Sequence, residues 1–391
     1  IYAMKEDSQG NIWLGTKGDG VIRMKPEADG SYSFRKFRHD PSDRFSLTND
    51  QIYSIEEDND GRIWFGLYGG GVCMLEHSDS DRFITPINRM TGYPMSQAEK
   101  VRYLLCGHDG MMFAATIEGL LVFDPAQRPE DMTFSVVQKI PGDRNSLGNN
   151  DIIHILETTD GSMWFSTFGG GINLLKDYQN GKEPRFEVFS TTEGLSSNIV
   201  FAATEDRHGN IWLSTENGIS RFDLKTHTFS NFSKYDGIPP ASFSEAAAMT
   251  TTDGRVLFGS IDNLYIIDPD AIKPVSELSN ITFTSFEMDN HEVLVGEKSP
   301  LRTSIVEAEN IRLPYDYSVF RIGFAALNHR IQPKIEYIYK LEGFDRDWNR
   351  ARGDRDAYYS NVPYGKYVFR VRSLSEGKYL EGDEASIEIT I

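Results

Sequence analysis

The chain has 391 residues, which is too long for one ordinary hydrophobic core and indicates two domains, one of them large. Its 58 acidic and 40 basic side chains leave a net charge of −18, so it lacks the basic footprint of a nucleic-acid-binding protein. An acidic surface is also a poor match for anionic lipids or other polyanions, unless a local basic patch overrides it. The 34 glycines and the 12% of aromatic residues are typical of short strands joined by tight turns.

The cysteines, the lengths of the apolar runs and the first residues of the chain are also informative. Only Cys73 and Cys106 occur, which is too few for a disulfide framework, and we expect both to be small buried apolar side chains. No run of 18 apolar residues is present that could span a membrane. Ile1 begins directly in strand-like sequence with no signal peptide, so we expect the chain to be a piece of a longer protein.

One unit recurs six times from the N-terminus onward. It consists of an alternating apolar strand, a polar turn ending in glycine, a short strand centred on a large apolar residue, a glycine-rich turn and another strand. By subtraction of their numbers, the turn glycines are spaced by 51, 49, 51, 48 and 45 residues; they are Gly10, Gly61, Gly110, Gly161, Gly209 and Gly254. The large apolar residue follows three positions later, as Trp13, Trp64, Phe113, Trp164, Trp212 and Leu257.

Each unit accommodates four strands. In the second unit we expect them at residues 52–56, 62–66, 72–75 and 82–86. Periods of about 40–50 residues with four strands each are the signature of β-propeller blades, and an apolar period of 2 rather than 3.6 disfavours a helical solenoid. The sequence therefore predicts an all-β protein with a β-propeller, in which the large residue of each second strand fills the wedge between adjacent blades.

Glycine runs follow the second strand at residues 69–71 and 169–171. Such runs permit the positive φ angles of a tight reversal between strands. A phosphate-binding loop is a weak alternative, because no Gly-Lys-Ser or Gly-Lys-Thr follows and no helix is expected after these glycines.

The second strands share a motif, which reads GNIWLGT at residues 10–16, GRIWFG at residues 61–66 and GNIWLST at residues 209–215. This motif resembles the two-component regulator propeller repeat. Residues 42–50 and 143–151 resemble the linker between blades in that family. The third repeat departs from the pattern, since methionines precede Phe113 and the triple glycine is missing.

The C-terminal part resembles a second module. Residues 337–348 (YIYKLEGFDRDW) closely resemble the start of the three-tyrosine (Y_Y_Y) domain, and residues 358–371 resemble its continuation. In the latter segment Tyr367, Phe369 and Val371 alternate with other residues, as in a strand with one buried face. Earlier strands are expected at residues 281–288, 311–313 and 319–324. The sequence thus predicts a propeller over residues 1–275 and an immunoglobulin-like β-sandwich over residues 276–391.

The two resemblances, in this order, imply the periplasmic sensor region of a hybrid two-component histidine kinase of the inner membrane, in a class typical of Bacteroides-like bacteria. They further imply that the region detects an oligosaccharide and controls polysaccharide-utilisation genes. A membrane-spanning helix beyond residue 391, a kinase elsewhere in the full-length protein and a homodimeric receptor are expected on the same ground. The sandwich, whose last strand is expected at residues 386–391, would transmit the signal as a dimerising lever rather than act as a binding site.

The residues themselves show no catalytic or metal-binding motif. The eight histidines lack metal-ligand spacing, and no Gly-x-Ser-x-Gly elbow occurs. Asp7, Asp58 and Asp206 each precede a turn glycine by three residues, where capping of the turn explains them. We therefore predict no catalytic residue, metal or cofactor. Two alternatives stay open: a propeller glycosidase or lyase, which would pair two carboxylates in one pocket, and a structural or adhesive module with a featureless face.

The propeller ring is expected to be incomplete. The sixth repeat has candidate strands at residues 246–251, 255–258 and 264–267, but no convincing fourth strand follows Asp268 and Pro269. Propellers commonly seal with a strand lent from the other terminus, and here the chain begins with an innermost strand. Since the resembling family usually has seven blades, we expect the six repeats to be part of a seven-bladed ring.

A ligand is expected on the face where the loops between second and third strands emerge beside the loops that enter each blade. These loops mix aromatic rings with amides and carboxylates, which a sugar needs for stacking and for hydrogen bonds to its hydroxyls. The alternative is that the polar residues only cap turns and the aromatic rings pack locally. The candidate ligand-binding residues are Lys17, Asp19, Asn49, Asp50, Tyr68, Asn149, Asn150, Phe168, Asn198, Glu216 and Asn217.

Overall fold

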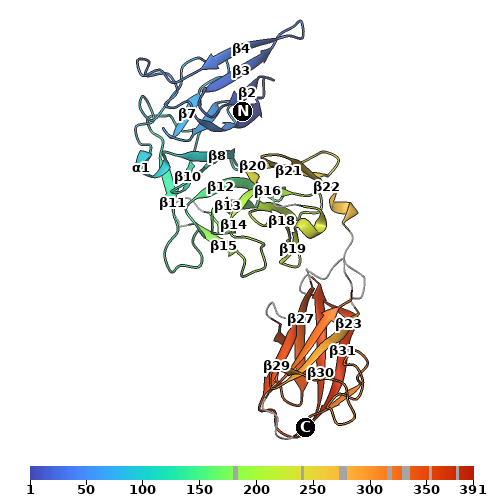
Figure 1. The fold of residues 1–391 in the computed structure, drawn as a ribbon. Coiled ribbons are helices and arrows are strands. Elements are labelled where there is room, and N and C mark those ends of the chain that lie inside the picture. Colours follow the sequence, from blue (N-terminus) through green and yellow to red (C-terminus); the bar gives the residue numbers. More distant parts are fainter. Residues whose placement is uncertain are drawn as a thin grey trace. The chain divides into compact units, whose positions relative to one another are not determined.

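The computed structural model describes residues 1–178, 184–238, 242–272, 280–314, 319–327, 335–351, 355–375 and 378–391 (Figure 1). The chain divides into two compact units, Ile1–Pro269 and Asp270–Ile391. The predicted boundary between residues 275 and 276 falls within 273–279, outside the described residues, and stays a prediction.

Six antiparallel sheets make up the first unit, and in each sheet the strands follow in chain order from the innermost strand outward. All six turn glycines have positive φ, between 76° and 88°, and they close the turn between first and second strand as predicted. A short helix α1 (Met95–Ala98) precedes the third sheet, and 3-10 turns η1 (Lys234–Asp236) and η2 (Pro269–Ala271) flank the sixth. The strands are β1 (Ala3–Glu6), β2 (Ile12–Gly15), β3 (Val21–Pro26) and β4 (Tyr32–Phe37); β5 (Ile52–Glu57), β6 (Ile63–Leu67) and β7 (Val72–Leu75); β8 (Val101–Cys106), β9 (Met112–Thr116), β10 (Gly119–Phe123) and β11 (Phe134–Val137); β12 (Ile152–Glu157), β13 (Met163–Thr167), β14 (Ile172–Asp177) and β15 (Arg185–Phe189); β16 (Val200–Glu205), β17 (Ile211–Thr215), β18 (Gly218–Asp223) and β19 (Thr228–Phe232); and β20 (Phe243–Thr250), β21 (Val256–Ser260) and β22 (Leu264–Ile267).

The second blade differs from the prediction of four strands. The predicted strand at residues 82–86 is wrong, because only Ile84 pairs with β7, through two backbone hydrogen bonds. The N–H of Phe83 turns instead to a carbonyl of the preceding linker, and the carbonyl of Thr85 accepts three N–H groups of a tight turn. Pro86 has no N–H with which to continue a ladder. These competing hydrogen bonds end the pairing after one residue.

A buried carboxylate holds the indole of the second strand in three blades. Asp58 accepts the indole N–H of Trp64 at 2.7 Å, and the same carboxylate accepts the backbone N–H groups of Asp60 and Arg62 in the turn. Asp7 with Trp13 (2.8 Å) and Asp206 with Trp212 (2.7 Å) repeat this arrangement. The predicted capping role of the three aspartates is confirmed, and each aspartate also satisfies a buried indole.

The remaining three blades lack this carboxylate. In the third and sixth blades the aspartate is replaced by Gly107 and Thr251, and the tryptophan by Phe113 and Leu257, which need no acceptor. The fourth blade keeps Trp164 but has a threonine at the position of the aspartate. Within the described part of the chain, the buried indole N–H of Trp164 has no hydrogen-bond partner.

We predict that Asp206→Ala lowers the free energy of unfolding by about 3 kcal/mol. The substitution removes the acceptor of a buried indole N–H and of two backbone N–H groups. Trp164→Phe is the matched comparison for Trp212→Phe, since both remove the same ring atoms but only Trp212 has an acceptor. We expect Trp164→Phe to cost about 1–2 kcal/mol less than Trp212→Phe in urea unfolding. Equal costs would show that the carboxylate contributes nothing to the indole.

The aromatic side chains fill the wedges between blades, as predicted. Trp13 packs against Phe65 of the second blade at 5.5 Å between ring centroids, and Trp64 packs against Phe123 of the third at 5.1 Å. Four buried clusters each join residues of two consecutive blades, from the first blade to the fifth. The burial of these rings between sheets therefore fixes the order and spacing of the blades.

The sixth and first blades leave apolar faces open. Consecutive innermost strands pack together from β1 through β5, β8, β12 and β16 to β20, but the described residues show no comparable packing between β20 and β1. On the first blade, Met4 (72% exposed) and Phe34 (67%) lie on the face away from the second blade. On the sixth, Leu264 (59%) and Ile266 (53%) lie on the face away from the fifth. As predicted, these six blades do not close a ring, and the seventh blade stays a prediction.

We predict that Phe34→Ala and Leu264→Ala change the free energy of unfolding of this chain by less than about 1 kcal/mol, because both side chains are exposed. Phe37→Ala, on the buried face of the same strand as Phe34, serves as control and costs about 3–5 kcal/mol. In a longer chain that carries a further repeat, the first two substitutions become destabilising by about 2 kcal/mol or more. Chemical denaturation of both chains measures this, and no difference between them would contradict a seventh blade at this position.

The second unit is a β-sandwich with an aromatic core. One sheet has the order β24-β23-β26-β29 and the other β25-β31-β30-β27-β28. Phe320, Phe324, Phe369 and Ile389 are buried between them, so the predicted sandwich is confirmed. The predicted strand at residues 386–391 is the end of a longer strand, β31. The strands are β23 (Ile281–Met288), β24 (His291–Glu292), β25 (Asn310–Arg312), β26 (Val319–Ala326), β27 (Ile335–Glu342), β28 (Asn349–Arg350), β29 (Asp356–Ser360), β30 (Lys366–Ser375) and β31 (Lys378–Thr390).

Candidate functional site

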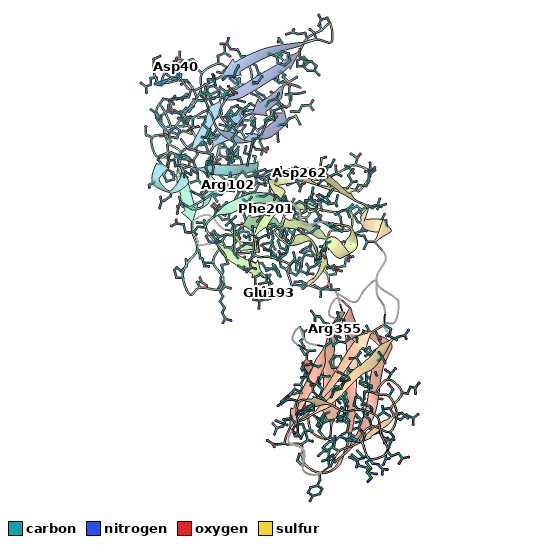
Figure 2. All side chains as sticks on the ribbon, in the orientation of Figure 1. Asp40, Arg102, Glu193, Phe201, Asp262 and Arg355 are labelled. Atoms are coloured by element: carbon teal, nitrogen blue, oxygen red, sulfur yellow. The ribbon has the colours of Figure 1, made fainter. Side chains whose placement is uncertain are left out.

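Four innermost strands carry a β-bulge at the same position. The register of β5, β8, β12 and β16 skips one residue near the start of each strand, namely Tyr53, Arg102, Ile153 and Phe201. Each of these residues stands eight positions before its turn glycine, as Tyr2 does in the first blade. A bulge re-aims its side chain out of the regular alternation. Figure 2 labels two of them, Arg102 on β8 and Phe201 on β16, among the innermost strands of the propeller.

A cavity of about 280 Å³ lies where the innermost strands converge. Its lining comes from β5, β8, β12 and β20 and from the first residues of the chain, and it includes Tyr2, Tyr53, Arg102, Tyr103 and Glu245. The register of β20 is irregular between residues 243 and 248, and there Ala246 has a φ of 55°. A non-glycine residue in this region is strained, and such strain is often retained where it places a functional side chain. Here the distortion lies next to Glu245.

Three tyrosines form a column beside the cavity. The ring of Tyr53 lies 4.3 Å from that of Tyr2 and is stacked on that of Tyr68 at 4.7 Å between centroids. The ammonium of Lys17 lies 5.4 Å from the ring of Tyr2, and the guanidinium of Arg102 lies 5.6 Å from the ring of Tyr68. Flat rings next to cations offer both a stacking surface and polar partners.

Arg102 links three blades through two carboxylates. Its Nε lies 2.9 Å from Asp151, and its Nη1 lies 2.8 Å from both oxygens of Glu245 in the sixth blade. Burial raises the pKa of Asp151 above its ordinary value, although Arg102 opposes this. Burial also raises the pKa of Tyr2 to about 12, with further contributions from Glu245 and Tyr53. One cation between two acids leaves this cluster with a net negative charge.

The predicted ligand-binding residues lie in loops that contact one another. The N–H groups of Gly69 and Gly71 donate to the carbonyl of Glu99 at the entry of the next blade, and Gly169 and Gly171 donate in the same way to Asn198. The two kinds of loop therefore emerge on one face, as predicted. Glycine is required here, since a Cβ on Gly171 would stand 2.0 Å from the carbonyl oxygen of Phe189.

Most of the predicted polar side chains hold these loops together. Asn49 and Asn149 each accept the backbone N–H two residues ahead, and Asp50, Asn150 and Asn198 each accept a backbone N–H of the linker before them. Asn217 donates to a loop carbonyl, Glu216 accepts from Ser197, and Asp19 pairs with Lys36 and Arg38. Their role toward a ligand stays a proposal.

Only Tyr68 and Lys17 of the predicted set join the tyrosine column, while Phe168 stands apart with 48% of its surface exposed. Tyr2, Tyr53, Arg102, Asp151 and Glu245 are not among the residues predicted to bind a ligand. The sequence does hold a signal for the first three. Aligning the repeats at their turn glycines places them at one equivalent position, which is occupied by Tyr2, Tyr53, Arg102, Ile153 and Phe201. No such signal points to Glu245, which belongs to an irregular strand.

The buried side chain of His154 helps to join the fourth and fifth blades. His154 Nδ1 accepts the backbone N–H of Ala203 in the next blade at 3.2 Å, and at the equivalent position Ser54 Oγ accepts that of Leu104 at 2.9 Å. Burial lowers the pKa of His154 to about 4. The interaction requires the neutral imidazole, because a protonated ring has no acceptor.

We predict that stability falls as the pH decreases from about 6.5 toward 4, because the unfolded chain takes up a proton on this histidine and the folded chain does not. The contribution of His154 over this range is roughly 3 kcal/mol. His154→Asn retains an acceptor but does not titrate. The difference in unfolding free energy between wild type and variant should therefore change by that amount between about pH 6.5 and pH 4. A difference that stays constant between pH 4 and 7 would contradict the assignment.

Comparison with known proteins places both halves of the chain. The profile of the two-component regulator propeller repeat matches residues 1–18, 46–69, 146–169 and 194–217, and that of the Y_Y_Y domain matches residues 331–391. The chain carries two-component regulator propeller repeats followed by a Y_Y_Y domain. The four matched repeats are those with a tryptophan on the second strand, and the third and sixth blades, which lack it, are not matched.

Three relatives share this organisation or its fold. The chain is 22% identical over its whole length to histidine kinase P4 of Formosa agariphila, and it spans 29% of that protein. Its fold is similar to the extracellular domain of a proposed hybrid two-component system of B. thetaiotaomicron, with a TM-score of 0.69 and 22% identity, over all of this chain and 55% of that one. PorZ, a surface component of the type-IX secretion system of Porphyromonas gingivalis, is more distant, with a TM-score of 0.52 and 14% identity over 51% of its chain.

The tyrosines of the Y_Y_Y domain are structural in this chain. The hydroxyl of Tyr337 accepts the N–H of Ala326 across the sandwich, and the hydroxyl of Tyr359 donates to Asp345 at 2.6 Å. Among the residues that the structure describes, no helix is long and apolar enough to cross a membrane, and no cluster of side chains suited to a metal ion is found.

Proposed function

We propose that this chain is the extracytoplasmic ligand-sensing region of a two-component sensor and that its propeller binds an oligosaccharide at the tyrosine column. The observation that carries the proposal is the placement of three adjoining tyrosine rings, of which Tyr53 and Tyr68 are stacked, beside the half-buried Arg102 and two carboxylates at the convergence of the blades. The order of propeller repeats and Y_Y_Y domain supports the sensor assignment. The kinase and the membrane segment belong to the longer protein and are part of the proposal.

The chemistry of the site suits a sugar. Pyranose rings have apolar faces that stack on aromatic rings, and their hydroxyls both donate and accept hydrogen bonds. Glu245 supplies acceptors and Arg102 supplies donors in the lining of the cavity, and Asp151 adds acceptors beside it through its contact with the same guanidinium. A volume of about 280 Å³ lies at the lower end of small-molecule sites, so one sugar ring would enter and the rest would lie over the loops with Tyr68 and Lys17.

A ligand at this place has a physical route to the rest of the propeller. Arg102 joins the third, fourth and sixth blades, so a ligand hydroxyl or carboxylate that competes for its guanidinium changes the contacts between these blades. A ligand shifts a conformational equilibrium only by its difference in affinity for the two states. Competition for Arg102 would provide such a difference if the ligand-bound arrangement of the blades gives up one of its two ion pairs.

The test starts with a panel of oligosaccharides screened by thermal shift, followed by calorimetry with the glycan that stabilises the chain. We predict that Tyr68→Ala weakens binding at least tenfold, because it removes the outer ring of the column. Phe168→Ala is the matched control, since it removes an exposed aromatic ring at the equivalent position of the fourth blade. Unchanged affinity of the Tyr68 variant, or equal losses in both variants, would contradict binding at the column.

A glycosidase is the second candidate, because Asp151 has a raised pKa and contacts the same guanidinium as Glu245, which lines the cavity. Both carboxylates are held by one guanidinium, whereas a glycosidase needs an acid free to protonate the leaving oxygen. We therefore favour binding over hydrolysis. Product analysis of the bound glycan separates the two, since cleavage that disappears in Asp151→Asn would establish the enzyme.

Transmission to a kinase would pass through the sandwich and a two-fold receptor. Cysteines introduced near Ile391 in the full-length receptor report on this arrangement through their cross-linking. A ligand that binds but alters neither cross-linking nor kinase output would exclude transmission through this end of the sandwich.

A further inference from the structure

The sandwich has a hollow of about 680 Å³ at the end where its last strand finishes. Lys298, Arg302 and Arg312 line it, together with polar groups of Ser299 and Asn310. No acidic side chain lines it among the residues that the structure describes. Within the same residues, none of the three cations has an ion pair, although the chain has an excess of 18 negative charges. Three cations without ion pairs converge here in a strongly acidic protein.

This hollow lies beside the last residues of the chain. Arg312 is paired in register with Thr390, and the N–H of Leu313 donates to the carbonyl of Thr390 at 2.9 Å. The backbone of Ile391 exchanges two hydrogen bonds with Gly365, so the turn that contains Tyr364 flanks the same end. Tyr364 is 88% exposed, more than any other large apolar or aromatic side chain of the described residues.

We propose that this hollow binds the phosphate groups of anionic phospholipids and orients the sandwich on the membrane surface. The inference rests on the proposed function, in which the chain enters a membrane shortly after Ile391. Guanidinium groups form bidentate hydrogen bonds to phosphate, and serine and asparagine add neutral donors. Exposed tyrosines favour the boundary between headgroups and water. The ligand class is therefore a lipid phosphate next to an interfacial ring.

The net negative charge of the chain does not prevent this contact. At physiological ionic strength charges are screened over about 8 Å, so the groups nearest the surface decide whether an anionic membrane attracts or repels it. Basic groups within that range are attracted to anionic lipids. The three cations share one hollow with Arg312 next to Thr390, so they would lie close to the surface if the chain continues into the membrane.

The 391-residue chain is tested by flotation with vesicles of phosphatidylcholine alone and with one-third phosphatidylglycerol. We expect binding only to the anionic vesicles, and a loss of at least tenfold in the triple variant Lys298→Gln, Arg302→Gln, Arg312→Gln. The control is the triple variant Arg128→Gln, Lys225→Gln, Arg355→Gln, which removes the same charge from exposed positions outside the hollow. Figure 2 labels Arg355, which lies on the sandwich itself. This control should bind the vesicles as the wild type does. Tyr364→Ala should weaken binding by a smaller factor.

Equal binding to both vesicles, or equal losses in both triple variants, would overturn the inference. Inorganic phosphate and glycerol phosphate are tested by thermal shift, and stabilisation by these without vesicle binding would assign the hollow to a free phosphate compound instead. Glycan binding measured on the same triple variant separates this inference from the proposed function. Intact glycan binding without any lipid binding refutes the lipid site alone, and lipid binding without any glycan response refutes the sugar site alone.

Discussion

The hydrogen bond from a buried indole to a turn aspartate joins the turn of a blade to the wedge beside it in three of the six described blades. A large ring must fill each wedge between blades, and tryptophan brings an N–H that is costly to bury without an acceptor. Asp58 supplies that acceptor and at the same time closes the turn that contains Gly61. Where the aspartate is absent, a phenylalanine or leucine replaces the tryptophan in two blades, and in the third Trp164 keeps a buried N–H without a partner among the described residues. One aspartate thus closes the turn and holds the ring that fills the wedge between two blades.

The innermost strands differ from blade to blade at one repeated position. The bulged positions Tyr53, Arg102, Ile153 and Phe201 differ in size, charge and polarity, although each follows a fully buried isoleucine or valine. A bulge frees one side chain from the ladder without disturbing the wedge. The side chains at the centre of this fold can therefore differ from blade to blade while the wedges keep the same packing.

The distribution of charge separates the two units. In the propeller, Arg102 is neutralised by two carboxylates inside the fold. In the sandwich, most cations of β30 and β26 are paired, for example Arg370 and Arg372 with Glu384, whereas those described around the hollow beside Ile391 are not. Paired charges order a site, and unpaired ones remain available to an outside anion. The same residue type thus has different roles at the two places.

The sequence by itself determined the repeat, the turn glycines, the wedge-filling aromatics, the two domain types and the face on which the loops emerge, because each depends on local periodicity and turn chemistry. It also predicted the open ring, since the fourth strand of the sixth repeat has no candidate. It could not show that the strand expected at residues 82–86 loses its partners to a linker and a turn. Nor could it bring Arg102 to Glu245, because that contact joins residues 143 positions apart through a distorted strand. Tertiary structure decided those points: side chains from different blades meet only after the wedges are filled, and no local pattern encodes that meeting.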